Sequence, residues 1–130
     1  MLKPLLLSFA VTALAGCAEP TIEVQVPLSV VSVSPHDGAN NIDPTAVPTI
    51  CFSKEMDLAA ASGNLVLELD GAGEVSGDAV IATGSAQCLS VSHPALMANT
   101  AYVVRAKQDL TSSDGTTLEV DVVSHYRTAP

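Results

Sequence analysis

The apolar positions of the chain begin with a nearly continuous run, Leu5–Ala15, that ends sharply at Glu19 and Pro20. One basic residue, Lys3, precedes the run, and small residues close it. A charged start, a short apolar centre and a small-residue end are typical of a secretory signal peptide. A transmembrane helix needs about 20 apolar residues, so this run is too short to span a bilayer. The pattern predicts an exported protein.

After Pro27 the apolar residues fall into short β-rich runs separated by turn residues, without a helical period. The cluster Pro35–Pro44 reads as turns, and Asp114-Gly115 is typical of a hairpin. Residues 55–62 fit one helical turn at a sheet corner. The predicted strands lie within 28–35, 47–54, 64–84, 86–94, 100–110 and 116–128, with several in the third range. About seven to nine short strands at this spacing predict an all-β, Ig-like antiparallel β-sandwich.

These patterns divide the chain into a signal peptide (1–16), a tether (17–27) and one β-sandwich domain (28–130). A domain of this length has the common size and buries about two thirds of its surface on folding. The stretch 18–27 spans about 35 Å when fully extended, at about 3.5 Å per residue. The domain is therefore expected close to the membrane, without a long stalk.

The sequence Leu14-Ala15-Gly16-Cys17 resembles the lipobox of bacterial prolipoproteins. The resemblance implies that Cys17 receives a diacylglyceryl group on its sulfur and becomes the first residue after cleavage. The new amino group is often acylated in that family, with palmitate-type chains. Two or more acyl chains hold a protein stably at a bilayer, whereas one chain binds only marginally. The alternative is a plain secreted protein that is cut nearby and leaves Cys17 as a free thiol.

Charge and aromatic content narrow the classes of partner. Removal of the leader removes Lys3 and leaves four basic residues against fourteen acidic ones, a formal net charge of −10. So acidic a surface argues against nucleic acids as partners and against electrostatic adhesion to anionic headgroups. Once Phe9 leaves with the leader, the aromatic residues are Phe52, Tyr102 and Tyr126. Stacking platforms for sugars or bases are therefore not expected.

A series of motif positions runs along the body of the chain: Pro35, Asp37, Gly38, Ala39, Ile42, Phe52, Ser53, Met56, Asp57, Pro94, Leu96, Thr100, Tyr102, Asp114, Gly115, Tyr126 and Thr128. With these positions, residues from about Val30 to Thr128 resemble the bacterial Ig-like domains named after a surface-layer protein, the SbsA type. The chain departs from that pattern in having Ser92-His93 before Pro94, one residue more than usual, and Tyr126 where Phe is commoner. The resemblance implies a β-sandwich that serves as a structural or interaction module.

Tyr102 follows the segment Leu96–Thr100 in the way of the tyrosine corner of Ig-like sandwiches. In that arrangement the ring packs at the start of a strand, and its hydroxyl bonds to the backbone a few residues upstream. The role predicted for Tyr102 is therefore structural and not catalytic.

With Cys17 lipidated, Cys51 and Cys88 remain as a pair in an oxidising compartment. Each alternates with large apolar neighbours, so both sulfurs are expected on the outer face of the sandwich. The Ig-like resemblance makes their strands neighbours in one sheet, which implies a cross-strand disulfide rather than the inter-sheet bridge of antibody domains. Adjacent strands bring Cα atoms to about 4.5–5.5 Å, within reach of a disulfide. Two unpaired thiols are the alternative.

Catalytic motifs are absent from the sequence. It contains no Gly-x-Ser-x-Gly elbow, His-Glu-x-x-His pair or Walker loop. The stretch Gly71–Gly77 resembles a nucleotide-binding glycine loop, but its spacing is one residue too long and β-branched residues follow, which favours a turn. We therefore expect no catalytic residue and no cofactor, and an enzyme ranks last of three hypotheses.

Metal binding is an alternative function. The soft or borderline ligands available to copper are His36, Met56, His93 and His125. The Pro, Gly-Ala and Phe-Ser pattern also resembles the periplasmic copper-carrier domain, although that family has a histidine at the mature N-terminus, where Cys17 stands here. Loop acids available to calcium are Asp37, Asp43, Asp109 and Asp114, without the regular calcium-loop spacing. Ordinary turn and strand roles explain these residues, and no metal ligand is assigned.

Taken together, the sequence predicts a small cell-envelope lipoprotein that presents one Ig-like domain as a non-catalytic structural or interaction module. Its membrane contact is the lipid on Cys17, and the expected partner is an envelope protein or polysaccharide. Ala18 and Glu19 show no obvious inner-membrane retention signal, so the outer membrane or cell surface is expected rather than the cytoplasmic membrane. The alternative is a periplasmic copper-binding protein.

Overall fold

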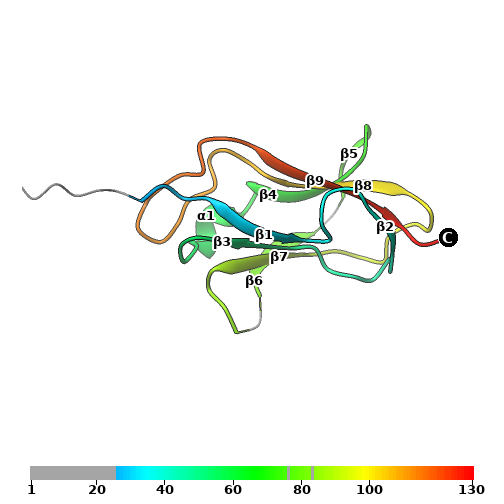
Figure 1. Ribbon diagram of the computed structural model, residues 1–130, viewed down its shortest axis with the longest axis horizontal. Coiled ribbons are helices and arrows are strands. Elements are labelled where there is room, and N and C mark those ends of the chain that lie inside the picture. Colours follow the sequence, from blue (N-terminus) through cyan, green and yellow to red (C-terminus); the bar gives the residue numbers. More distant parts are fainter. Residues whose placement is uncertain (1–25, 76, 83) are drawn as a thin grey trace, which may run out of the picture.

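The computed structural model describes residues 26–130 except 76 and 83. The predicted signal peptide, the lipid site Cys17 and most of the tether lie outside the described residues. The described chain forms nine strands and one short helix in two facing layers (Figure 1). The elements are β1 (Val30–Ser34), β2 (Ala39–Ile42), β3 (Thr49–Phe52), α1 (Leu58–Ala61), β4 (Leu65–Leu69), β5 (Gly73–Glu74), β6 (Asp78–Ile81), β7 (Cys88–Ser92), β8 (Ala101–Ala106) and β9 (Val122–Thr128).

The strands form two sheets, one in the order β1-β3-β7-β6 and the other in the order β2-β9-β8-β4-β5. Alternate residues of the central strands point between the sheets and are buried, as period-two alternation requires. Examples are Ile50, Phe52, Leu67, Leu89 and Val104, each at most 1% exposed. This arrangement confirms the predicted all-β, Ig-like sandwich with a core of aliphatic residues.

The helix α1 is the single turn that the sequence predicts for residues 55–62. It begins after Asp57, whose Oδ1 accepts a hydrogen bond from Ala59 N at 3.0 Å and so caps the first turn. No helix among the described residues is long and apolar enough to cross a membrane.

The segment Pro35–Pro44 is more than the turn cluster that the sequence predicts, because it contains β2. β2 runs parallel to β9 and adds a parallel pair to the otherwise antiparallel pairings of the described strands. The chain changes sheets between β1 and β2, so it enters the second sheet in the direction of β9. Gly38, at φ 87°, makes this turn, and its N donates to His125 O at 2.7 Å.

Residues 107–121 form an irregular connection, although the sequence assigns most of them to two long strands joined by a hairpin. The prediction is wrong in extent because Leu110 and Leu118 leave the sheet to cover the end of the sandwich, where both are buried. The predicted hairpin at Asp114-Gly115 is present, with Gly115 at φ 90° and an antiparallel bridge between Thr111 and Thr117, but it is shorter than the sequence suggests. Leu118 N donates to Leu110 O at 2.9 Å within this connection.

Tyr102 lies in β8, 2% exposed, and its hydroxyl accepts a hydrogen bond from Met97 N at 2.9 Å. Its ring packs against Tyr126 of the neighbouring β9, with centroids 6.2 Å apart. Thr128 of β9 donates its hydroxyl to Met97 O at 2.6 Å and accepts from Thr100 N at 2.9 Å. These bonds, of the tyrosine-corner kind, tie the loop before β8 to the end of β9.

Candidate interaction surface

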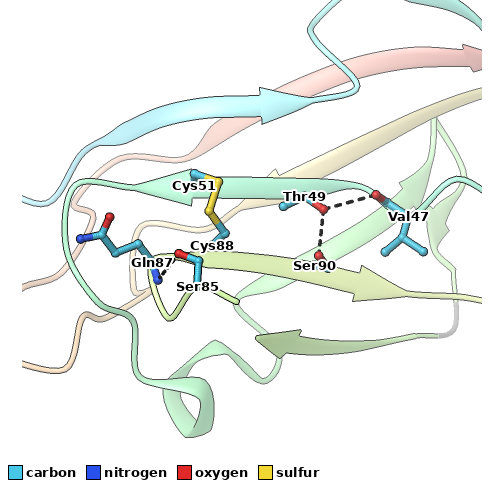
Figure 2. The surroundings of a disulfide bond; sticks show 7 residues. All are labelled: Val47, Thr49, Cys51, Ser85, Gln87, Cys88 and Ser90. Carbon is cyan, nitrogen blue, oxygen red and sulfur yellow. Dashed lines mark hydrogen bonds between the residues drawn. A yellow bond between two sulfur atoms is a disulfide. The ribbon is translucent and has the colours of Figure 1, made fainter. Parts of the chain in front are cut away.

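Cys51 and Cys88 form a disulfide between neighbouring strands of the four-stranded sheet (Figure 2). They stand directly opposite each other in the β3–β7 pair, with Cα atoms 4.0 Å apart. The residues on either side of Cys51, Ile50 and Phe52, are buried, so the sulfurs lie on the outer surface. This confirms the predicted cross-strand pairing within one sheet.

Hydroxyl groups surround the disulfide on the same surface. Thr49 Oγ1 and Ser90 Oγ are 2.8 Å apart across β3 and β7 (Figure 2). The strand register places a set of side chains here that we call the hydroxyl face: Ser32, Ser34, Thr49, Cys51, Asp78, Val80, Cys88, Ser90 and Ser92. Asp78 is the charged member of this set. In a chain of net charge −9, this nearly neutral surface can approach another macromolecule with little like-charge repulsion.

The outer surface of the five-stranded sheet carries ion pairs instead. Arg105 contacts Glu68 through Nε at 2.6 Å and Asp121 through Nη1 at 3.5 Å. Lys107 Nζ lies 3.5 Å from Glu74 Oε1. The hydrogen bond to Glu68 raises the pKa of Arg105 above its ordinary value. Because these pairs are partly exposed, each contributes little to stability, and their role is to balance charge locally.

A second candidate site lies where the turn before β2 meets β9. Asp37 Oδ1 accepts a hydrogen bond from His125 N at 2.8 Å and lies 3.1 Å from His125 Nδ1. The backbone N–H, followed by the ring, holds the pKa of Asp37 below its ordinary range. An open depression of about 170 Å³ lies beside the pair and is lined by Gly38, Ala39, Asn40, Ala101, His125, Tyr126 and Arg127. This size suits contact with a side chain rather than enclosure of a small molecule.

The residues considered as copper ligands do not come together. Both ring nitrogens of His93 face backbone carbonyl oxygens, at 2.7 and 2.8 Å, and Met56 is 3% exposed in the core. His125 contacts Asp37, and His36 lies in the exposed turn before β2. Within the part of the chain that the structure describes, no group of three or more His, Cys, Asp or Glu side chains is placed to hold a metal ion.

Two of the acids considered for calcium support their own turns. Asp43 accepts hydrogen bonds from the backbone and side chain two residues further on, both at 2.8 Å. Asp114 accepts from Ser112, from Thr116 and, at 2.9 Å, from Lys54. These hydrogen bonds hold the pKa of both carboxyl groups below the ordinary range.

Residues 24–128 match the family of bacterial Ig-like domains. The chain belongs to this family. The matched range includes both sheets, the Tyr102 hydrogen bond and the disulfide of the Ig-like domain. Comparison with curated proteins gives no match.

Solved structures share the fold of this Ig-like domain at low sequence identity. CopC from Methylosinus trichosporium OB3b has a TM-score of 0.65 and 19% identity over 79% of this chain and 94% of CopC. Domains 1–6 of the surface layer protein SbsC have a TM-score of 0.58 and 20% identity over 82% of this chain and 14% of the SbsC chain. Native E. coli alpha-2-macroglobulin has a TM-score of 0.59 and 17% identity over 79% of this chain and 6% of that protein. At these identities the likeness shows the fold, and function must be argued from the site.

Sequence reasoning missed two features of the Ig-like domain. The hydroxyl face had a usable signal, because Ser and Thr alternate with apolar residues in β1, β3 and β7. The Asp37–His125 contact joins residues 88 positions apart, and no local pattern marks it.

Proposed function

We propose that the chain is a bacterial cell-envelope lipoprotein that presents one Ig-like domain as a non-catalytic structural or interaction module. The observation that carries this proposal is the Cys51–Cys88 disulfide, because disulfides persist in exported proteins and are rare in the cytoplasm. The leader supports the same compartment, and the family match begins at residue 24, shortly after Cys17. A lipid on Cys17 would hold the domain near the bilayer surface.

Metabolic labelling with radioactive palmitate tests the anchor. The full-length chain is expressed in a bacterial host as wild type, as Cys17→Ser, and as the double variant Cys51→Ser/Cys88→Ser, which removes the other two cysteines. Wild type and the double variant are expected to take up label and sediment with membranes, whereas Cys17→Ser does neither. Unlabelled wild-type protein would remove the lipid anchor from the proposal. Density-gradient separation of the membranes tests the expected outer-membrane or cell-surface location.

The hydroxyl face is the surface we propose for contact with an envelope protein or polysaccharide. Its near neutrality means that a partner need not compensate the charge of an acidic chain. Crosslinking in intact cells tests this by comparing Ser32→Glu, which adds charge on the face, with Ser113→Glu, which adds it to an exposed loop. Adduct yield is expected to fall in Ser32→Glu alone. Equal yields in the two variants would show that the face is not the contact.

Copper carriage is a second candidate, and the likeness to CopC over 94% of that protein gives it weight. Asp37 Oδ1 and His125 Nδ1, two possible ligand atoms, lie 3.1 Å apart. Titration of the purified protein with Cu(I) and Cu(II) separates the two candidates. The interaction-module proposal expects no saturable binding. Stoichiometric binding that His125→Ala abolishes would move copper carriage to first place.

A further inference from the structure

Among the described residues the outer edge of β6 has no strand partner; α1 and β4 lie near β6, but no backbone hydrogen bond joins them to Ala79 or Ile81. Among the described residues β6 pairs with β7 alone, and it forms one margin of the four-stranded sheet (Figure 1). A hydrogen bond from Ala82 N to Cys88 O, at 2.9 Å, fixes the phase of the ladder. Backbone groups of successive residues in an antiparallel strand point to opposite sides. The N–H and C=O groups of Ala79 and Ile81 therefore point away from β7, toward the open side.

The other three sheet margins are obstructed in ways that proteins use to prevent edge pairing. β1 has a register shift between Val30 and Ser32, and β2 has one between Ala39 and Ile42. β5 is two residues long. β6 instead keeps a regular four-residue register and contains neither Lys nor Pro. It also exposes large apolar side chains, Val80 at 40% and Ile81 at 42%.

We propose that β6 pairs antiparallel with β6 of a second copy of this chain, around a twofold axis at Val80. Opposed residues in a sheet point to the same face, so a register centred on Val80 keeps the outer faces of both copies on one side. Ala79 of each copy then stands opposite Ile81 of the other. Because these residues carry the free backbone groups, each such pair can exchange two N–H···O bonds. The exposed valines meet at the axis in the closer, non-hydrogen-bonded type of pair.

The charge on β6 permits this self-pairing. Asp78 is the charged residue of the strand, and the register places it opposite Ala82 of the other copy rather than opposite another carboxylate. The two Asp78 residues are separated by four residue steps, about 14 Å along the strand, which exceeds the Debye length of about 8 Å at physiological salt. The hydroxyl face beside β6 adds no further charge from β3 or β7. Each copy therefore supplies a compatible occupant for the edge of the other.

The contact area is small, so pairing depends on a high local concentration of the chain. A four-residue edge buries less than the roughly 1,200 Å² of specific stable interfaces, so dilute protein in solution would be mostly monomeric. Confinement of copies to one membrane raises their effective concentration and favours pairing. This step rests on the proposed lipid anchor, whereas the register of the pairing follows from the domain alone.

Photo-crosslinking in cells tests the pairing. Two full-length copies with different tags are co-expressed, one wild type and the other carrying p-benzoylphenylalanine at position 80. Irradiation is expected to give an adduct of twice the monomer mass that contains both tags. The same probe at position 31, on the obstructed edge of the same sheet, is the control and should give no such adduct. An adduct from position 80 with a different protein or within one copy, no adduct, or equal dimer yields from both positions would overturn the proposal.

A charge substitution gives an independent test. Val80→Lys places two ammonium groups opposite each other at the axis, and Val31→Lys makes the same change on the β1 edge. Energy transfer between fluorescent tags on the two copies, measured in intact cells where the membrane keeps the copies concentrated, should fall by about tenfold for Val80→Lys and remain unchanged for Val31→Lys. Formation of the Cys51–Cys88 disulfide in each variant, assayed by alkylation without reductant, shows that the domain has folded. Unchanged energy transfer in a folded Val80→Lys variant would contradict the pairing.

The experiments distinguish failure of the proposed lipid anchor from failure of the proposed β6 pairing. In Cys17→Ser the double-tagged adduct should decrease if the anchor concentrates the copies, and the palmitate experiment reports the anchor directly. An adduct in wild type without palmitate label would leave the edge pairing standing and reject the lipid. Palmitate label without an adduct would reject the edge pairing and leave the lipid.

Discussion

Tyr126 offers the most specific test of the packing of the Ig-like domain. Its side chain is 3% exposed, and its hydroxyl is buried without a hydrogen-bond partner among the described residues. Burial raises the pKa of Tyr126 to about 12. The neighbouring Tyr102 is equally buried, but its hydroxyl accepts the hydrogen bond from Met97 N. The same substitution, Tyr→Phe, should therefore have opposite effects at these two positions.

The magnitudes follow from what each hydroxyl contacts. Tyr126→Phe keeps the ring and removes a buried hydroxyl that has lost its hydration without gaining a bond, so the free energy of unfolding should rise by about 1 kcal/mol. Tyr102→Phe removes a hydrogen bond and leaves Met97 N unpaired, which should cost about 1–3 kcal/mol. Urea denaturation of the oxidised protein, followed by circular dichroism, measures both. Destabilisation by Tyr126→Phe of more than about 1 kcal/mol would refute the reasoning.

Alkaline pH gives a second test of the same side chain. An unfolded chain ionises tyrosine near pH 10, whereas folded Tyr126 ionises near 12, so the folded state binds more protons between these values. Ionisation of this tyrosine therefore leaves the free energy of unfolding unchanged below pH 10 and lowers it as pH rises toward 12, by an amount on the order of 2–3 kcal/mol. Tyr126→Phe should remove this part of the alkaline loss. An unchanged pH dependence in the variant would contradict the burial of the hydroxyl.

Other predictions concern the disulfide, an acidic turn and one glycine. Replacing Cys51 and Cys88 by Ser opens a loop with a sequence separation of 37 and should lower the free energy of unfolding by about 4 kcal/mol in the chain-entropy model; no loss in urea denaturation would argue against that origin. Because the pKa of Asp114 is lowered by hydrogen bonds, its contribution is present above about pH 4 and lost as pH falls below it. Asp114→Asn should flatten that acid dependence in pH titrations of stability, and an identical acid limb would contradict the role. A Cβ on Gly77 would overlap the backbone oxygen of Ser92, so Gly77→Ala should lower the free energy of unfolding by about 1–3 kcal/mol and speed hydrogen exchange in β6; unchanged exchange would show that the backbone accommodates the added methyl group.

The sequence predicts strands well where one face of a strand is buried. In β3 and β7, apolar residues alternate with polar ones because one side of each strand packs into the core, and alternation alone indicates the face of the cysteines. β2 has no such pattern, since Ala39 is its one buried residue and its partner β9 comes from the far end of the chain. Its place in the sheet depends on long-range backbone bonds that local sequence does not encode.

In the connection 107–121 the sequence instead predicts strands that the structure does not form. Leu110 and Leu118 extend the apolar pattern of the flanking strands, so periodicity continues the strands through them. Both are buried at the end of the sandwich rather than between hydrogen-bonded strands. The sequence also does not show which strands lie at the edges of the sheets, because the position of β6 at an edge depends on which strands pair. The composition of the hydroxyl face was thus readable, whereas the open edge beside it was not.

The export and lipidation of this Ig-like protein are tested most directly by the intact mass of native protein from the membrane fraction. The account predicts a chain that begins at Cys17, carries a diacylglyceryl thioether on that sulfur, and contains the Cys51–Cys88 disulfide. A species that retains Met1, or one with an unmodified sulfur at Cys17, would contradict it.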